Sequence, residues 1–212
     1  MKKFVCALAL LFAGTANAGV ISIGSGSTST NDCTIGCMAI YQQAYDSSYF
    51  GSSPVTLDSL SLYGGAGYSG TYDVFIGYMN GDYSTITTNF SSNFASGSTL
   101  VDSINLATDI VGNVLTIDLG FVYDSNLGDL LIEFNRTSAS SSGSFAASSV
   151  YNWSRAYEWS PEWGVDRRFA HSGYALNSSF ITSSEAVPTP ATLALFGLGL
   201  AGLGFSRKKK AA

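Results

Sequence analysis

Apolar and polar residues alternate with a period of two through most of the middle of the chain. Because side chains in a strand point alternately to the two faces of a sheet, this period predicts β-strands with one buried face. The clearest runs place apolar residues at every second position: Tyr72, Val74, Ile76 and Tyr78; Leu115, Ile117, Leu119 and Phe121; and Leu130, Ile132 and Phe134.

A change of phase marks residues 55–62. The apolar residues of 55–57 and of 60–62 each keep the period of two, but the two sets are out of step with one another. This predicts a β-bulge near Asp58-Ser59. Residues 39–44 fit either a strand or a short helix, and residues 169–176 and 180–182 are expected to close the sheets.

Turn-forming clusters rich in Gly, Asn, Asp and Ser separate these runs, at residues 64–67, 80–82 and 138–143. Short strands at such spacing, without a long amphipathic helix, predict an all-β fold, an antiparallel β-sandwich or jelly-roll-like body. The 168 residues from Gly19 to Ala186 are enough for one such domain.

The N-terminus has the pattern of a secretory signal peptide. Lys2 and Lys3 precede an apolar helix-forming stretch at 4–13, and small residues, Ala16 and Ala18, follow at a cleavage site. We expect signal peptidase to cut after Ala18, so that residues 1–18 are removed. A membrane-spanning helix is the alternative, but the apolar run is far shorter than the ~20 residues that a bilayer requires.

The C-terminus combines an uncharged apolar stretch at 191–206 with a basic tail, Arg207, Lys208, Lys209 and Lys210. Sixteen helical residues reach ~24 Å, which is slightly short of the ~30 Å hydrocarbon core, so we expect a short transmembrane helix in the inner membrane. The basic tail is expected to stay on the cytoplasmic side. The motif Val187, Pro188, Thr189, Pro190 comes immediately before the helix.

A proline-spaced motif, a short apolar helix and a basic cluster, in a chain that begins with a secretory signal, resemble the PEP-CTERM class of exported bacterial proteins. The resemblance covers residues 187–212, and Thr189 stands where the family usually has glutamate. It implies that an exosortase-type membrane enzyme recognises the motif, removes the helix and passes the protein to the cell surface or the exopolysaccharide matrix. A C-terminal anchor that is never cut is the alternative.

The charge distribution excludes one class of partner. Between the two basic ends the chain has four arginines, no lysine and all fifteen acidic residues, a formal charge of −11. Such a body repels a phosphate backbone, so we expect no nucleic acid as a partner.

Two cysteines, Cys33 and Cys37, remain after the signal peptide. In an oxidising compartment such a pair usually forms a disulfide, which here requires a turn, because residues four apart in a strand lie too far from one another. A metal site is the alternative, although no second Cys/His pair is present to complete it. We therefore expect a disulfide and no metal or other cofactor.

Catalytic motifs are not recognisable in the chain. His171 is the single histidine and lies in no hydrolase signature, and among the acids Glu158 and Glu162 form the best pair for a glycosidase. Residues 124–129 place several oxygen ligands in one loop, which fits either a calcium site or, better, a tight turn. We expect no catalytic residues and a protein that is not an enzyme.

All three tryptophans fall within eleven residues, a segment taken as a Trp-rich loop. Exposed on one surface, such a loop could stack on sugar rings; alternatively, it folds over one end of the sandwich and buries its aromatic side chains. The expectation is therefore an exported surface or matrix protein with a structural or interaction role; the alternatives are a carbohydrate-binding module and, less favoured, a secreted glycoside hydrolase. The candidate glycan-binding residues are Trp153, Tyr157, Trp159 and Trp163.

Overall fold

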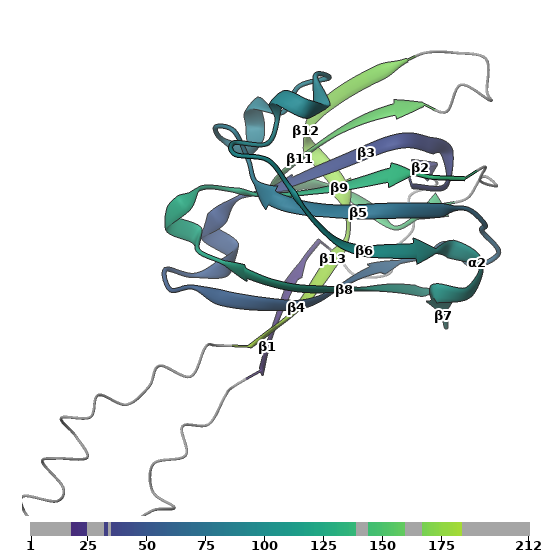
Figure 1. Cartoon of the computed structure of the whole chain (residues 1–212), viewed down its shortest axis with the longest axis horizontal. Coiled ribbons are helices and arrows are strands. Elements are labelled where there is room, and N and C mark those ends of the chain that lie inside the picture. The colour runs from purple at the N-terminus through teal and green to yellow at the C-terminus, as the bar shows by residue number, and fades with distance from the viewer. Residues whose placement is uncertain (1–17, 25–31, 34, 139–143, 160–166, 184–212) are drawn as a thin grey trace, which may run out of the picture. The chain divides into compact units, whose positions relative to one another are not determined.

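The computed structural model describes residues 18–24, 32–33, 35–138, 144–159 and 167–183. In this part of the chain two antiparallel sheets form a sandwich-like body, shown in Figure 1, and Ala18–Ser184 group into one compact unit. The predicted all-β, antiparallel sandwich is confirmed, while the narrower jelly-roll expectation and the domain boundaries stay predictions. The expected signal helix and C-terminal helix lie outside the described residues.

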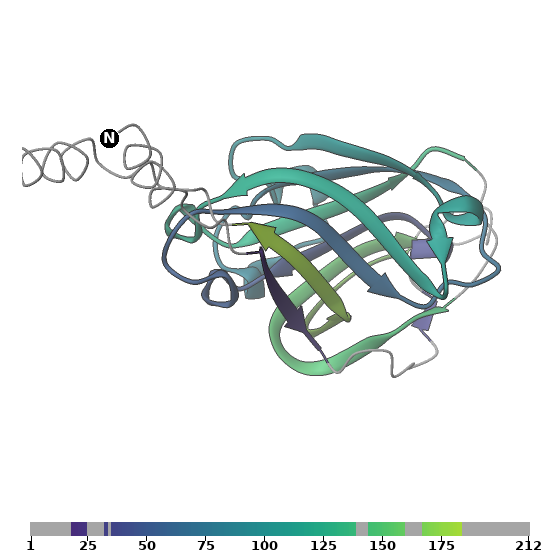
Figure 2. The ribbon, with the colours of Figure 1, turned by 90° about the horizontal axis from the view of Figure 1, so that it is seen from below.

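The first sheet has five strands, in the spatial order β1, β13, β4, β8, β7. Figure 2 shows β1 and β13 side by side, and in this pair Ala18 is directly opposite Ser183. The two ends of the described chain therefore leave from neighbouring residues. The strand bounds are β1 Ala18–Ile23, β4 Val55–Tyr63, β7 Ile110–Val111, β8 Val114–Tyr123 and β13 Ser178–Ser183.

The second sheet has six strands, in the spatial order β12, β11, β3, β9, β5, β6. Their bounds are β3 Met38–Tyr45, β5 Thr71–Tyr78, β6 Thr99–Asn105, β9 Leu130–Arg136, β11 Ala147–Trp159 and β12 Arg168–Leu176.

Short elements complete the fold. A two-stranded sheet joins β2 Asp32–Cys33 to β10 Ser144–Phe145. Single helical turns connect the strands: η2 Ile35–Cys37, η3 Ser47–Phe50, η4 Tyr83–Thr85, η5 Phe90–Ser92, α2 Leu106–Asp109 and η6 Ser125–Leu127.

The predicted strands are confirmed where the period of two was clear, in β5, β8 and β9. The bulge is confirmed as well, since the register of β4 shifts against both neighbours between Leu57 and Ser59. This shift explains why Leu57 and Leu60 both point into the core although their spacing is odd. The segment that fitted a strand or a helix is strand β3.

The core lies between the facing sheets and is rich in aromatic side chains. Tyr45 of β3 meets Phe180 of β13 edge to face, with ring centroids 5.2 Å apart and planes at 81°. This geometry is favoured by the ring quadrupoles, and both side chains are almost completely buried. Aromatic contacts of this kind hold the two sheets together.

Candidate functional site

The outer face of the six-stranded sheet, which points away from the core, is partly covered by residues 80–97, here called the covering segment. Its two ends meet, because Met79 forms a β-bridge with Phe94 and the Asn80 amide donates to the Asn93 carbonyl at 2.7 Å. The turn predicted at 80–82 begins it, and the Asp82 carboxylate accepts from the Ser84 amide at 2.8 Å, which caps η4.

An apolar cluster separate from the main core attaches this segment to the sheet. Ala44, Leu131 and Ala156 from three neighbouring strands pack against Ile86 and Phe90, and all five are buried. Strands β3, β9 and β11 are therefore apolar on both faces over part of their length.

A buried polar network is the second attachment. Gln42 on β3 is fully buried; its Nε2 donates to the Phe90 carbonyl at 3.0 Å and to Glu133 Oε2 at 2.6 Å. Its Oε1 accepts from Asn93 Nδ2 at 2.7 Å. The other hydrogen bonds of the Asn93 side chain go to Thr87, inside the covering segment. One glutamine thus joins the segment to a carboxylate on the neighbouring strand.

Asp129 is the third attachment. Its Oδ1 accepts from the Ser47 amide at 2.8 Å and its Oδ2 from the Tyr83 amide at 2.7 Å. The start of residues 124–129 forms a capped turn, since Asp124 Oδ1 accepts from the Asn126 amide at 3.0 Å. Both acids thus bind backbone N–H groups, which favours the turn interpretation over the calcium alternative.

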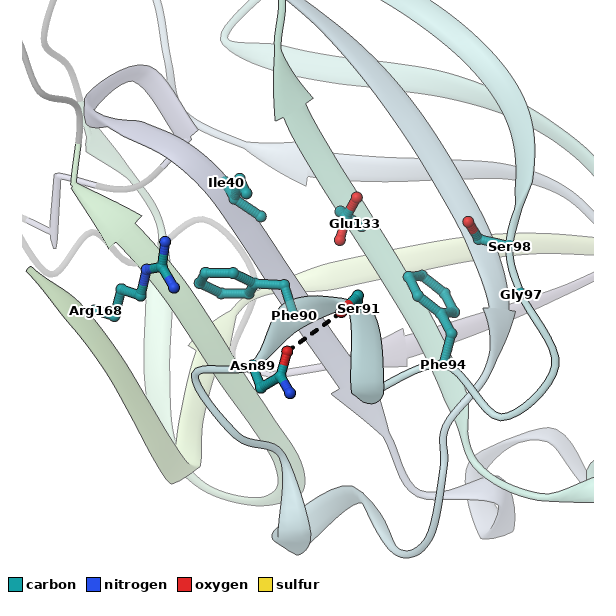
Figure 3. Close-up of a pocket in the computed structure, with 9 residues that line it drawn as sticks. All are labelled: Ile40, Asn89, Phe90, Ser91, Phe94, Gly97, Ser98, Glu133 and Arg168. Carbon is teal, nitrogen blue, oxygen red and sulfur yellow. Dashed lines mark hydrogen bonds between the residues drawn. The ribbon is translucent and has the colours of Figure 1, made fainter. Parts of the chain in front are cut away.

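The rim of the covering segment and the sheet enclose an open cleft of about 440 Å³, shown in Figure 3. In this view Glu133 projects from β9 between the side chains of Phe90 and Phe94. The sheet contributes one residue each from β3, β9 and β12, and the covering segment and Ser98 contribute the rest. The lining residues are Ile40, Glu133, Arg168, Asn89, Phe90, Ser91, Phe94, Gly97 and Ser98.

Gly77 on β5 allows the covering segment to lie this close to the sheet. A Cβ atom at position 77 would meet the Phe94 ring and the Gly97 carbonyl oxygen, each at 3.0 Å. A side chain at this position would therefore push one wall of the cleft outwards.

Burial dominates the electrostatics of the cleft. It raises the pKa of the Glu133 carboxyl above its usual range, and the hydrogen bond from Gln42 offsets only part of this effect. Arg168 lies at the rim with its Cζ 5.8 Å from the centre of the Phe90 ring, and its Nε contacts Glu158 Oε2 at 3.2 Å. The cleft thus combines an acceptor, several donors and an apolar wall.

The structure corrects the interpretation of the tryptophan segment. Residues 153–159 are not a loop but part of strand β11, and Trp153 is completely buried in the core, where it cannot stack on a sugar. Tyr157 is 8% exposed and stacks on Phe169. Trp159 is half-buried, and Trp163 lies outside the described residues. Glycan binding by these two residues stays a prediction.

Other sequence-based sites are placed only in part. Ala18, the predicted cleavage residue, begins β1, while Ala16 and all of 187–210 lie outside the described residues. Cys37 is buried in turn η2, so the chain turns as a Cys33–Cys37 disulfide requires, but the bond itself stays a prediction. Glu158 pairs with Arg168, and its proposed catalytic partner Glu162 is not described.

Sequence reasoning missed Glu133, Gln42 and Phe94. The one available signal was the run Leu130-Leu131-Ile132, which is apolar at consecutive positions. Such a run is typical of a strand that is covered on both faces, and it pointed to a further layer over β9.

Comparison with known families gives one match: residues 186–208 match the PEP-CTERM protein-sorting motif. This sorting signal indicates an exported protein that is made as a membrane-anchored precursor. More narrowly, the chain has a PEP-CTERM sorting motif, which implies processing by an exosortase-type membrane enzyme, and the resemblance to the PEP-CTERM class is confirmed over residues 187–208. No curated protein and no solved structure matches the chain. Within the residues that the structure describes, no helix is long and apolar enough to cross a membrane.

Proposed function

We propose that the protein is an exported β-sandwich that is released from its membrane anchor and acts, without catalysis, as an interaction component of the cell surface or exopolysaccharide matrix. The observation that carries this proposal is the position of the sorting motif. It occupies residues 186–208, directly after the last described strand, β13, which ends at Ser183. The whole sandwich therefore lies on one side of the point where an exosortase cuts.

The composition of the cleft supports binding rather than catalysis. Glycosidases use two carboxyl groups on either side of the scissile bond, whereas Glu133 is the one carboxylate among the residues that line the described cleft. The nearby Glu158 is paired with Arg168. A structural or interaction role is the function that this arrangement favours.

The intact mass of the protein, measured in the envelope and in the matrix fraction, tests the proposal. We expect a product that starts at Gly19, ends near Pro190 and is found outside the membrane. A protein that retains Arg207–Ala212 and is present only in the membrane would overturn the release step.

Two variants make the experiment specific. The double substitution Pro188→Ala and Pro190→Ala should accumulate as the uncut precursor, because the proline-spaced motif is lost. Thr189→Glu is the matched control; it gives the residue that the family usually has and should be cut at least as efficiently as the natural chain. Equal processing of all three proteins would show that the motif is not what the enzyme reads.

A further inference from the structure

The carboxylate of Glu133 has more acceptor capacity than its surroundings use. Oε2 accepts one hydrogen bond, from Gln42, and in the described part of the chain Oε1 has neither a donor nor a cation within ion-pair distance. An ionised carboxylate has about four acceptor sites. Glu133 is partly buried and lines the open cleft, so its remaining acceptor sites are accessible to hydrogen-bond donors of a ligand.

The other polar groups of the cleft are donors. Asn89 Oδ1 already accepts from Ser91 Oγ at 3.2 Å, and among the described residues the side-chain nitrogen Nδ2 of Asn89 remains for a ligand. The Arg168 guanidinium binds Glu158 through Nε and, at 3.5 Å, through Nη2, and its side chain is 52% exposed at the rim. The acceptor Glu133 and the donors Asn89 and Arg168 therefore line the same cleft.

This combination distinguishes between ligand classes. A hydroxyl group both donates and accepts, so a ligand rich in hydroxyls can use Glu133 and the donors together. An ammonium group donates only and would offer no acceptor to Asn89 or Arg168. A carboxylate ligand would be repelled by Glu133. It would also be repelled by the negative charge of the body, since the chain between its two basic ends has a formal charge of −11.

The apolar wall and the size of the cleft fit one type of hydroxylated ligand. Phe94 and Ile40 are partly exposed, and they form a surface against which the C–H face of a sugar ring can pack. The volume of about 440 Å³ lies in the range of small-molecule binding sites, roughly 300–1,000 Å³.

We propose that this cleft binds a pyranose unit of an uncharged polysaccharide. Glu133 accepts hydrogen bonds from ring hydroxyls, Asn89 and Arg168 donate to them, and Phe94 packs on the C–H face of the ring. The choice of polysaccharide rests on the proposed function, because a protein of the exopolysaccharide matrix is surrounded by such chains. The site is distinct from the tryptophan segment, whose Trp153 lies in the core.

Titration calorimetry of the full-length protein in detergent tests this site independently of sorting. The probes are neutral hexasaccharides of glucose, galactose, mannose and xylose, with oligogalacturonate as the anionic probe and a chitosan hexamer as the cationic one. We expect saturable binding of at least one neutral probe and weaker binding of both charged probes.

Three variants locate the binding. Glu133→Gln keeps an acceptor for Gln42 but loses the charge, and Phe94→Ala removes one wall; each should weaken binding about tenfold or more. Asp73→Asn is the matched control: Asp73 bonds to Ser103 on the neighbouring strand, does not line the cleft, and its replacement should change the affinity less than about twofold. Thermal unfolding of each variant checks that it is folded.

The outcomes separate clearly. If no neutral probe gives a saturable heat of binding, the site is overturned. It is also overturned if Glu133→Gln and Phe94→Ala leave the affinity unchanged. Stronger binding of the chitosan hexamer overturns the ligand class and assigns the cleft to amines. Loss of exosortase processing with intact sugar binding would contradict the proposed function and leave this inference standing.

Discussion

The two sheets of the sandwich share one core but have opposite outer faces. On the five-stranded sheet, the row Ser22, Ser179, Ser61 and Thr116 crosses four strands in register. Its outer face is exposed even where it is apolar: Val20, 69% exposed, lies directly opposite Ile181, 43% exposed. On the six-stranded sheet, Leu131 is fully buried under the covering segment.

The difference is due to the covering segment, which in the described part of the chain forms a partial third layer on the six-stranded sheet alone. The five-stranded sheet is a half-buried sheet with a solvated face, whereas the six-stranded sheet has a partial second cover. A partial cover has a rim, and the cleft lies along that rim. The six-stranded side is therefore where we expect specific binding.

The largest expected effect comes from removing the second apolar cluster. Leu131→Ala should lower the free energy of unfolding by about 2–5 kcal/mol, because it opens a cavity under the covering segment. Ile181→Ala, on the outer face of the other sheet, is the matched control and should cost no more than about 0.5 kcal/mol. Urea denaturation measures both. Similar losses at the two positions would mean that the two faces are not different.

The next effect in size concerns the polar attachment. Asp129→Asn replaces one of two carboxylate oxygens by an amide that cannot accept from the Ser47 or Tyr83 amide. Leaving one of these N–H groups without an acceptor should cost about 1–3 kcal/mol. Hydrogen exchange should then accelerate at residues 80–97 more than in β8. A uniform acceleration along the chain would contradict a local role.

A smaller, pH-dependent effect is expected at Glu133. Burial raises the pKa of this carboxyl in the folded state, so the folded protein binds the proton more tightly than the unfolded chain does. The contribution of Glu133 to stability is therefore most favourable below its usual pKa and is lost as the pH rises through the raised value.

Glu133→Gln should accordingly be more stable than the natural protein at pH 7, and this advantage should disappear near pH 4, about the usual pKa of a glutamate. Denaturation curves of both proteins at the two pH values measure the difference. A variant that is less stable at pH 7 would show that the carboxylate supports the fold.

The smallest effect is predicted for the hydroxyl row. The hydroxyls of Ser61 and Thr116 are exposed and lie 3.4 Å apart. Ser61→Ala should change the free energy of unfolding by less than about 0.5 kcal/mol and leave sugar binding unchanged. A loss of binding here would move the site to the other sheet.

Much of the fold was predictable because several strands have one buried and one solvated face. In β8, Leu115, Ile117 and Leu119 are buried while Thr116 and Asp118 are exposed, so the sequence period reports the geometry directly. The bulge in β4 was predictable for the same reason, since an extra residue shifts the phase of the pattern.

Strands covered on both faces were harder to interpret. β3 contains Gln42 and Gln43, which are both buried and hydrogen-bonded, so polarity there does not indicate exposure. In β11 the inward residue Arg155 lies between the aromatic rings of Tyr157, at 4.9 Å, and Tyr174, at 4.3 Å. A buried arginine among tryptophans gave this strand the composition of a charged loop.

The cleft was not predictable from the sequence, since its walls come from four distant segments. Ile40, Phe94, Glu133 and Arg168 meet only because the strand order places β3, β9 and β12 in one sheet under the covering segment. Local patterns do not contain that order.

The pairing of β1 with β13 also determines how the body responds to tension. Hydrogen bonds in an antiparallel pair run perpendicular to the strands, so a pull that separates the ends at Ala18 and Ser183 opens the ladder one bond after another. A body held through both ends would peel in this way, whereas the predicted cut after Ala18 would remove that load. The anchor would then pull on the sandwich through β13 alone. This strand is hydrogen-bonded to β1 on one side and to β4 on the other.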